Sequence, residues 1–138
     1  MIEINNLTSF AVDKKLLTGV AKKVLKGENR ERESISVALV SKEEIKKLNK
    51  QFRKKDTPTD VLSFNLKSNP KDVLGEVVIC PEAVKENAKK FNFTFKEELV
   101  KMLVHGILHI AGYEHEQSAK EAKKMEAKEL YYLSRILR

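Results

Sequence analysis

The chain reads TFKEELVKMLVHGILHIAG from Thr94 to Gly112, and this stretch is its most apolar segment. Thr94 and Glu97 have the spacing of a capping box, which predicts that a helix begins here. Gly112 predicts the end of the helix, because glycine adopts the left-handed conformation that closes many helices. A helix that is apolar on nearly every side belongs in the core of a domain. The apolar positions are Leu99, Val100, Met102, Leu103, Val104, Ile107, Leu108 and Ile110.

Strands are predicted mainly in the first half of the chain. Ile2 and Ile4 suggest a first strand, and residues 34–40 alternate with β-branched side chains. Residues 60–66 and 73–79 have the same character and flank a turn-rich segment, which predicts a hairpin.

Two helices are predicted between these strands, and the others follow them. Apolar residues at helical spacing end at Gly27, and residues 41–44 have the form of a capping box. The helix that they open carries an apolar face of Ile45, Leu48 and Phe52. Further helices are expected from Pro81 to about Lys90, and from a capping box at Ser118 to about Ile136. The pattern predicts an α+β fold, with about four strands in a mixed sheet packed with helices around the central buried helix.

Length and composition predict one small domain over residues 1–138, with 41% hydrophobic residues for its core. The first residues, Met1 to Asn5, alternate apolar and polar types and do not resemble a signal peptide. The apolar segment around residues 99–111 is too short to span a bilayer. The single cysteine, Cys80, fits a reducing compartment. We therefore expect a cytoplasmic protein without a membrane partner.

All three histidines of the chain lie within eleven positions, at His105, His109 and His115. Residues four apart on a helix share a face, so His105 and His109 can hold one metal ion between them. Gly112 allows a sharp turn that returns His115 toward that face as a third ligand. The alternative, core histidines with ordinary hydrogen-bonding partners, leaves several imidazoles unexplained in an apolar setting. We predict one Zn²⁺, or another divalent transition metal, per chain.

Three protein ligands leave one coordination position open, which favours a catalytic over a structural metal. The alternative is a closed site, in which Glu114, Glu116 or another carboxylate is the fourth ligand. The spacing of the histidines and of Gly112 equals that of the metzincin peptidases, His-Glu-x-x-His-x-x-Gly-x-x-His. Their general base is a glutamate, and Gly106 stands in its position here. A metallopeptidase is therefore the second hypothesis.

Basic residues concentrate between Lys42 and Lys55, where the net charge is +5 of the +7 of the whole chain. Lys46, Lys50 and Arg53 follow i, i+4, i+7 spacing and form one basic stripe on the predicted helix. Such a stripe is usually a solvated helix face. Beside a hydrolytic metal, however, a guanidinium that binds phosphate through two donors suits a phosphodiesterase. We predict that these three residues bind the substrate.

Three blocks of the sequence closely resemble the YbeY family of bacterial endoribonucleases, the rRNA maturation factors. The first is the histidine stretch itself, from His105 to His115, in which Glu114 replaces the usual aspartate. The second comprises Leu48-Asn49, Phe52-Arg53, Asp56 and Pro58-Thr59-Asp60-Val61-Leu62-Ser63-Phe64, and the third is Gly75-Glu-Val-Val-Ile-Cys80.

This resemblance implies a zinc-dependent, zincin-like endoribonuclease that acts on single-stranded RNA and not on DNA. It implies His105, His109 and His115 as metal ligands and Arg53 as a catalytic or RNA-binding residue. It also implies a role in the maturation of ribosomal RNA precursors, above all of the small ribosomal subunit, and in ribosome quality control. A non-catalytic ribosome-assembly factor with a structural metal is the third hypothesis.

Two further expectations concern single side chains. Glu126 and Glu129 fall within the arc that Ala122, Met125, Leu130, Leu133, Ile136 and Leu137 form on the helix after Ser118. We hypothesise that at least one of these carboxylates is buried and paired with a basic residue or a ligand histidine, since unpaired buried carboxylates are rare. Phe91, Phe93 and Phe95 are interpreted as a hydrophobic junction before the central helix and not as a base-stacking surface.

Overall fold

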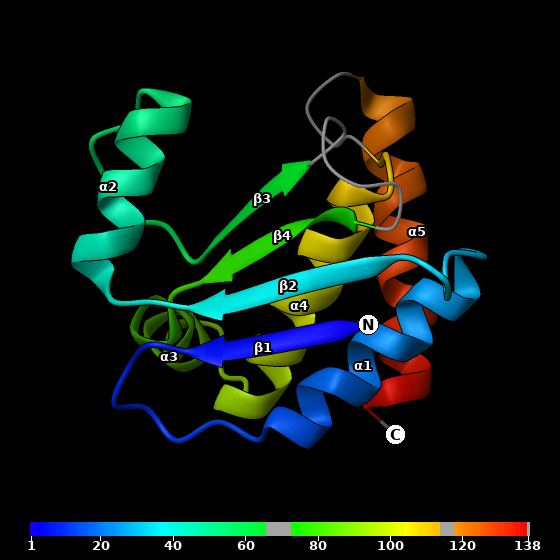
Figure 1. Cartoon of the computed structure of the whole chain (residues 1–138), viewed down its shortest axis with the longest axis horizontal. Helices are drawn as coiled ribbons and strands as arrows, with labels where there is room; N and C mark the ends of the chain where they lie inside the picture. Colours follow the sequence, from blue (N-terminus) through cyan, green and yellow to red (C-terminus); the bar gives the residue numbers. More distant parts are fainter. Residues whose placement is uncertain (66–72, 114–117, 138) are drawn as a thin grey trace.

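The computed structural model describes residues 1–65, 73–113 and 118–137 (Figure 1). The predicted α+β fold is confirmed, with four strands and five helices in the described residues. The elements are β1 (Ile2–Asn6), α1 (Lys14–Gly27), β2 (Ser34–Leu39), α2 (Lys42–Arg53), β3 (Val61–Asn65), β4 (Val73–Ile79), α3 (Pro81–Lys90), α4 (Phe95–Ile110) and α5 (Ala119–Ile136). None of the helices described is long and apolar enough to cross a membrane.

The four strands form one mixed sheet with the order β1-β2-β4-β3. β1, β2 and β4 are parallel, and β3 is antiparallel to β4, as expected for the predicted hairpin. The turn of that hairpin, together with Leu66, lies outside the described residues. In the described sheet β3 is an edge strand, because only β4 pairs with it.

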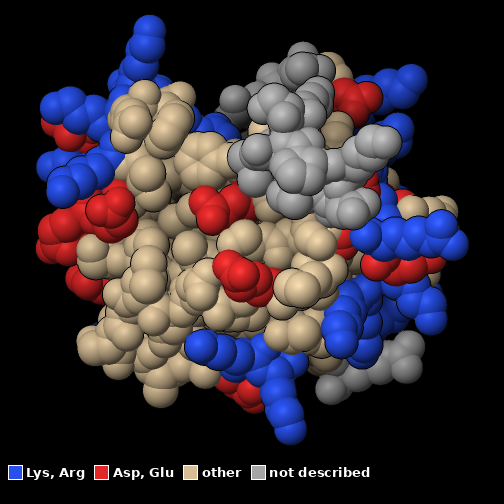
Figure 2. Space-filling view, in the orientation of Figure 1, with Lys and Arg blue, Asp and Glu red and all other residues tan. Residues whose placement is uncertain are grey.

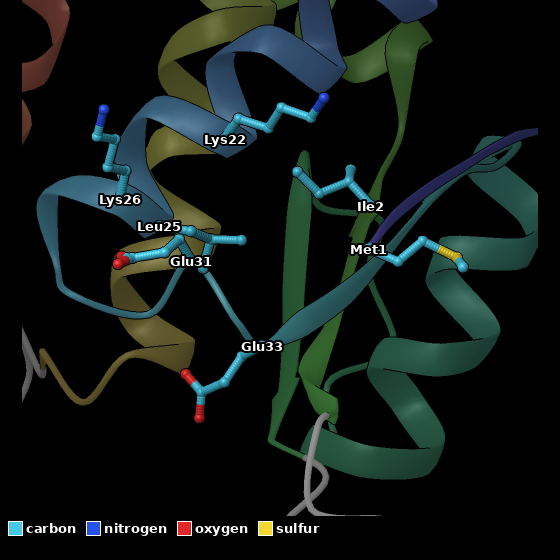
Figure 3. A pocket seen from close by; sticks show the side chains of 7 residues that line it. All are labelled: Met1, Ile2, Lys22, Leu25, Lys26, Glu31 and Glu33. Carbon is cyan, nitrogen blue, oxygen red and sulfur yellow. The ribbon is translucent and has the colours of Figure 1, made fainter.

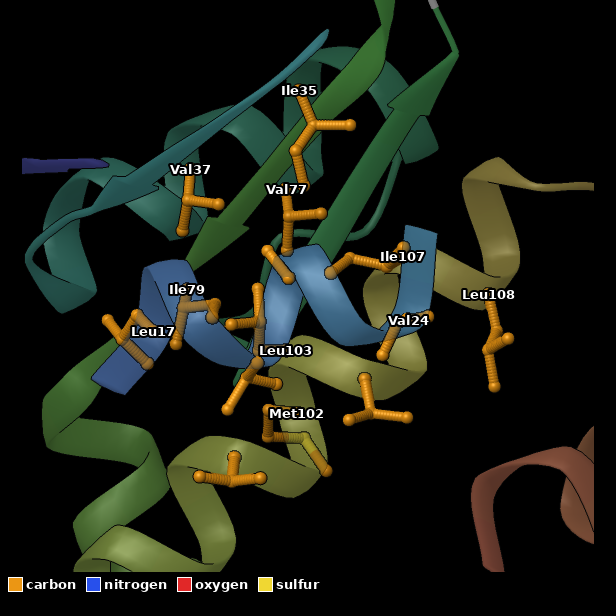
Figure 4. Packing of buried hydrophobic residues seen from close by; sticks show 14 of the residues in the cluster. Leu17, Val24, Ile35, Val37, Val77, Ile79, Met102, Leu103, Ile107 and Leu108 are labelled. Carbon is orange, nitrogen blue, oxygen red and sulfur yellow. The ribbon is translucent and has the colours of Figure 1, made fainter. Parts of the chain in front are cut away.

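One face of the sheet packs against α1 and α4. Val37 and Leu39 of β2 and Val77 and Ile79 of β4 are fully buried in this layer, as Figure 4 shows for three of them together with Leu103 of α4. α4 contacts β3 and β4 as well as α1, α3 and α5, so it is the central buried helix that the sequence predicts.

The opposite face of the sheet carries a smaller apolar cluster beneath α2. Alternate residues of a strand point to opposite faces, so Leu62 of β3 and Val78 of β4 pack here with Ile45 of α2. Phe52, predicted on the same apolar face as Ile45, is exposed. It lies at the last turn of α2, where its ring and that of Phe64 meet edge to face, with 5.2 Å between the ring centroids.

Two side chains of β3 hold the C-terminal half of α4 against the sheet. The Ser63 hydroxyl donates to the carbonyl of Gly106 at 3.2 Å, and the Asn65 amide donates to that of Ile110 at 3.3 Å. Gly106 permits this close approach, because a Cβ there would lie 2.7 Å from Cγ1 of Val77. Gly112, with φ of +111°, lies in the turn that follows α4, as predicted.

α5 is tied to the end of α1 by a partly buried carboxylate, Glu28. Glu28 accepts hydrogen bonds from the hydroxyls of Tyr132 in α5 and of Tyr113, which follows α4, and it forms an ion pair with Lys128 at 3.3 Å. Burial alone would raise the pKa of Glu28, but these partners together lower it below the ordinary value. The apolar stripe predicted for α5 is wrong at Leu130, which is exposed, because this residue lies about 140° around the helix from the buried Met125.

The three phenylalanines before α4 do not form the predicted junction. Phe95 is partly buried and stacks on Phe10, with ring centroids 6.2 Å apart, but Phe91 and Phe93 are exposed. The prediction failed because the connection from α3 to α4 turns at Asn92, whose φ is +62°, and runs over the surface.

Candidate functional site

A pocket of about 230 Å³ lies where the end of α2, the start of β3 and the C-terminal half of α4 meet. It brings together two of the predicted metal ligands and the predicted arginine, which are far apart in the sequence. Its lining residues are Asn49, Arg53, Lys55, Thr59, Asp60, Val61, Leu62, Ser63, His105 and His109.

His105 and His109 lie one helical turn apart on the wall of this pocket. Their ring centroids are 5.3 Å apart and their planes meet at 71°. The predicted third ligand, His115, lies outside the described residues, as do Glu114 and Glu116. Within residues 1–65, 73–113 and 118–137, no group of three or more His, Cys, Asp or Glu side chains is arranged to hold a metal ion. The donor set of two imidazoles from one helix turn still fits two ligand positions of a transition metal.

Glu129 of α5 confirms the hypothesis of a paired carboxylate in the arc. Its Oε1 is hydrogen-bonded to Nδ1 of His105, and its side chain is only 16% exposed, whereas Glu126 is exposed. A carboxylate that accepts this hydrogen bond favours the tautomer of His105 with its proton on Nδ1, and in that tautomer Nε2 is the ring nitrogen whose lone pair can serve a metal ion.

The end of α2 directs two basic side chains to the pocket. Arg53 is the last residue of the helix, and Lys54 follows in the left-handed conformation with φ of 57° and ψ of 30°. Arg53 and Lys55 both line the pocket wall opposite the histidines' helix. Asn49 is buried and donates its amide to the carbonyl of Thr57 at 2.9 Å, which fixes the segment after the helix.

The rest of the predicted basic stripe does not reach the pocket. Lys46 and Lys50 are exposed and absent from the pocket lining, and Nζ of Lys46 lies 4.0 Å from a carboxylate oxygen of Asp56. Figure 2 shows Lys and Arg side chains grouped around the upper part of α2, and Asp and Glu below them. The two lysines therefore lie on the surface of α2 and not in the pocket wall.

The pocket also contains polar residues whose role the sequence reasoning did not assign. Asp60 accepts a hydrogen bond from the Asn87 amide at 2.9 Å and a longer one from the Thr59 hydroxyl at 3.4 Å. Ser63 faces the same space from β3. The only sequence signal for both was their membership of the block from Pro58 to Phe64.

A second pocket, of about 290 Å³, lies beside α1 and the start of β1 (Figure 3). It is lined by three apolar and four charged residues: Met1, Ile2, Leu25, Lys22, Lys26, Glu31 and Glu33. None of the predicted site residues lines it, so the histidine pocket is the better candidate for chemistry.

Comparison with known proteins decides the family. The model of the family described as Endoribonuclease YbeY matches residues 3–137. The chain belongs to the YbeY family. This assignment agrees with the resemblance of the three sequence blocks, and it does not favour the peptidase hypothesis.

Individual YbeY relatives are similar over most of the chain. Endoribonuclease YbeY of Thermotoga neapolitana is 50% identical over 101 residues, which are 73% of this chain and 66% of the relative, just under two thirds of its length. That of Persephonella marina is 40% identical over 119 residues, 83% of this chain and 78% of the relative. The solution structure of TM1509 from Thermotoga maritima has a TM-score of 0.71 and 42% identity, and the match covers 99% of this chain and 89% of that one.

Proposed function

We propose that this YbeY-family chain is an endoribonuclease that cleaves single-stranded RNA in the cytoplasm. We propose ribosomal RNA precursors as its substrates, and roles in small-subunit maturation and in ribosome quality control. Residues 1–138 form one catalytic domain in this proposal. The observation that supports it most is that Arg53 of α2 lines the same pocket as His105 and His109 of α4.

We propose that one Zn²⁺, or another divalent transition metal, is held by His105, His109 and His115. The support is the donor chemistry: two imidazoles share a pocket wall, and the Nδ1 of one of them is already bonded to Glu129. A metal ion bound there supplies a Lewis acid that activates water or withdraws charge from a phosphate oxygen. The role of Glu129 is to hold the His105 ring in one tautomer and one orientation.

Arg53 would bind the phosphate of the scissile bond. Its guanidinium matches two phosphate oxygens at once and remains charged at all physiological pH values. Its position beside the histidines suits it to stabilise charge that builds up on the phosphate in the transition state. Lys55 adds a second positive charge in the pocket, and Lys46 and Lys50 attract RNA from outside it.

The peptidase hypothesis requires a carboxylate from elsewhere in the chain, because Gly106 stands where a metzincin has its general base. Position 106 itself has no room for a side chain, since a Cβ there would lie 2.7 Å from Val77 and 3.3 Å from the Ser63 hydroxyl oxygen. The family match does not favour this hypothesis. The third hypothesis, an assembly factor with a structural metal, explains neither the open pocket nor the arginine in it.

One experiment separates the three functions. The purified chain is incubated with single-stranded RNA and with casein, each with and without a chelator. We expect cleavage of RNA only, and its loss with chelator. Elemental analysis of the wild type and of the triple alanine variant at 105, 109 and 115 tests the ligands. About one ion per wild-type chain and none in the variant is the expected result, and full metal content in the variant would refute the ligand assignment.

A further inference from the structure

Phe93 is an exposed aromatic side chain close to the helix that carries the histidines. Phe93 is 48% exposed, and Nζ of Lys101 lies over its ring, 5.7 Å from the ring centroid. The side chain thus combines open aromatic surface with a positive charge over the ring.

Lys101 connects this ring to the pocket. Lys101, His105 and His109 are spaced four residues apart on α4, so their side chains follow one another along one side of the helix. Four residues of an α-helix advance by about 6 Å, which puts the backbone of Lys101 one turn before that of His105. The Phe93 ring therefore lies at the end of a row that leads into the histidine pocket.

We infer that Phe93 and Lys101 form a stacking site for one base of single-stranded RNA outside the cleavage pocket. This inference rests on the proposed function, because it names a further contact of the same substrate. A base stacks on an aromatic ring whatever its identity, and an ammonium group beside the ring attracts the neighbouring phosphate. Single-stranded RNA, a polyanion with unpaired bases, satisfies both halves of the site, whereas duplex RNA keeps its bases stacked on each other.

Phe91 provides a matched control on the same surface. It is 57% exposed and has its own lysine, with Nζ of Lys90 at 5.6 Å from the ring centroid. Both residues belong to the end of α3, however, and Lys90 is not part of the row on α4. Phe91 and Phe93 thus share chemistry and exposure, and they differ in their connection to the histidines.

The first test compares the alanine variants. A short labelled single-stranded RNA is titrated with wild type, Phe93→Ala and Phe91→Ala, and cleavage kinetics are measured in parallel. For Phe93→Ala we expect about five- to tenfold weaker binding, at the low end for loss of a stacked base, and a matching rise in KM with little change in kcat. Phe91→Ala should stay within about twofold of wild type, and melting temperatures check that both variants fold.

The second test uses tryptophan, which the chain lacks. In Phe93→Trp the indole keeps an aromatic surface for stacking and reports on it by fluorescence. We expect single-stranded RNA to quench this emission strongly, duplex RNA to quench it little, and Phe91→Trp to respond weakly to both.

Equal RNA affinity for Phe93→Ala and Phe91→Ala, or equal quenching of the two tryptophans, would overturn the inference, and Phe93 would then be a contact for another partner such as a protein. Failure of the proposed function differs from failure of this inference, because in the former case the wild type itself would neither bind nor cleave single-stranded RNA.

Discussion

The carboxylate of Glu129 on α5 is hydrogen-bonded to Nδ1 of His105 on α4, and the two residues are 24 positions apart. This contact joins two helices that approach the site from different parts of the chain. A carboxylate that accepts this hydrogen bond favours the tautomer of His105 with its proton on Nδ1. The geometry of a predicted metal ligand therefore depends on a residue that is not a ligand in our proposal.

Replacing Glu129 by alanine should weaken metal binding without removing it. Loss of such a partner of a ligating histidine typically costs about 10- to 100-fold in metal affinity. Glu129→Gln should lose less, since the amide oxygen still accepts from Nδ1. Competition with a chromogenic chelator measures the affinity. Glu126→Ala, which changes an exposed glutamate on the same helix, is the control and should bind metal as the wild type does.

Arg53→Ala should lower RNA cleavage while metal content and melting temperature stay unchanged. Arg53→Lys should rescue only in part, because an ammonium keeps the charge but loses the planar pair of donors. If the contact forms mainly in the transition state, kcat falls more than KM rises. Lys50→Ala is the matched control on the same helix but outside the pocket. Equal small losses for both alanine variants would refute a special role for Arg53.

Gly106→Ala should destabilise the fold. The new Cβ would lie 2.7 Å from a methyl group of the buried Val77, so the layer between α4 and β4 must shift, at a cost of about 1–3 kcal/mol. Gly19→Ala is a sharp contrast, because nothing lies within 4 Å of its Cβ position in α1. That variant should gain roughly 0.5–1 kcal/mol from the better helix propensity of alanine. Denaturant unfolding of both variants and the wild type measures the free energies of unfolding, which should fall for Gly106→Ala and rise for Gly19→Ala.

Glu98→Gln should make stability less sensitive to pH. Glu98 is buried, its Oε1 has no hydrogen-bond partner in the described structure, and burial raises its pKa above 4.5. As pH rises above 4.5, the unfolded chain releases this proton more readily than the folded chain, in which burial disfavours the charged carboxylate. The free energy of unfolding therefore falls with rising pH. Glutamine avoids that loss. The melting temperature of the variant should exceed that of the wild type at pH 8 and nearly equal it at pH 4. The same difference at both pH values would show that ionisation of Glu98 is not its cause.

Much of the fold was predictable because its signals are local. Capping residues such as Thr94, the helix-opening Pro81 and the alternation along β2 fix where elements begin and which face is buried. The strand order β1-β2-β4-β3 was not predictable, since pairing of distant strands leaves no local pattern. The exposure of Leu130 and Phe93 was missed for a related reason: periodicity identifies an apolar side chain but not whether a neighbour covers it.

The site was predictable in its parts and not in its assembly. The spacing of His105 and His109 identified them as candidates, and an apolar arc with two carboxylates pointed to Glu129. The left-handed backbone at Lys54, which sends Arg53 and Lys55 to the pocket, had no signal, because glycine or asparagine usually marks that conformation. Asp60 owes its position to Asn87, a partner on a different element that only tertiary structure reveals.

The link between Glu129 and His105 also sets an order of events during translation. Protein synthesis runs from the N-terminus, so the ribosome makes His105 first and the carboxylate that orients it 24 residues later. At about 5–20 residues per second this delay is on the order of one to five seconds. During that interval the histidine helix can exist while its ring lacks the contact that selects the tautomer. The His105 ring therefore reaches its final orientation only after α5 has been synthesised and has left the ribosome to fold.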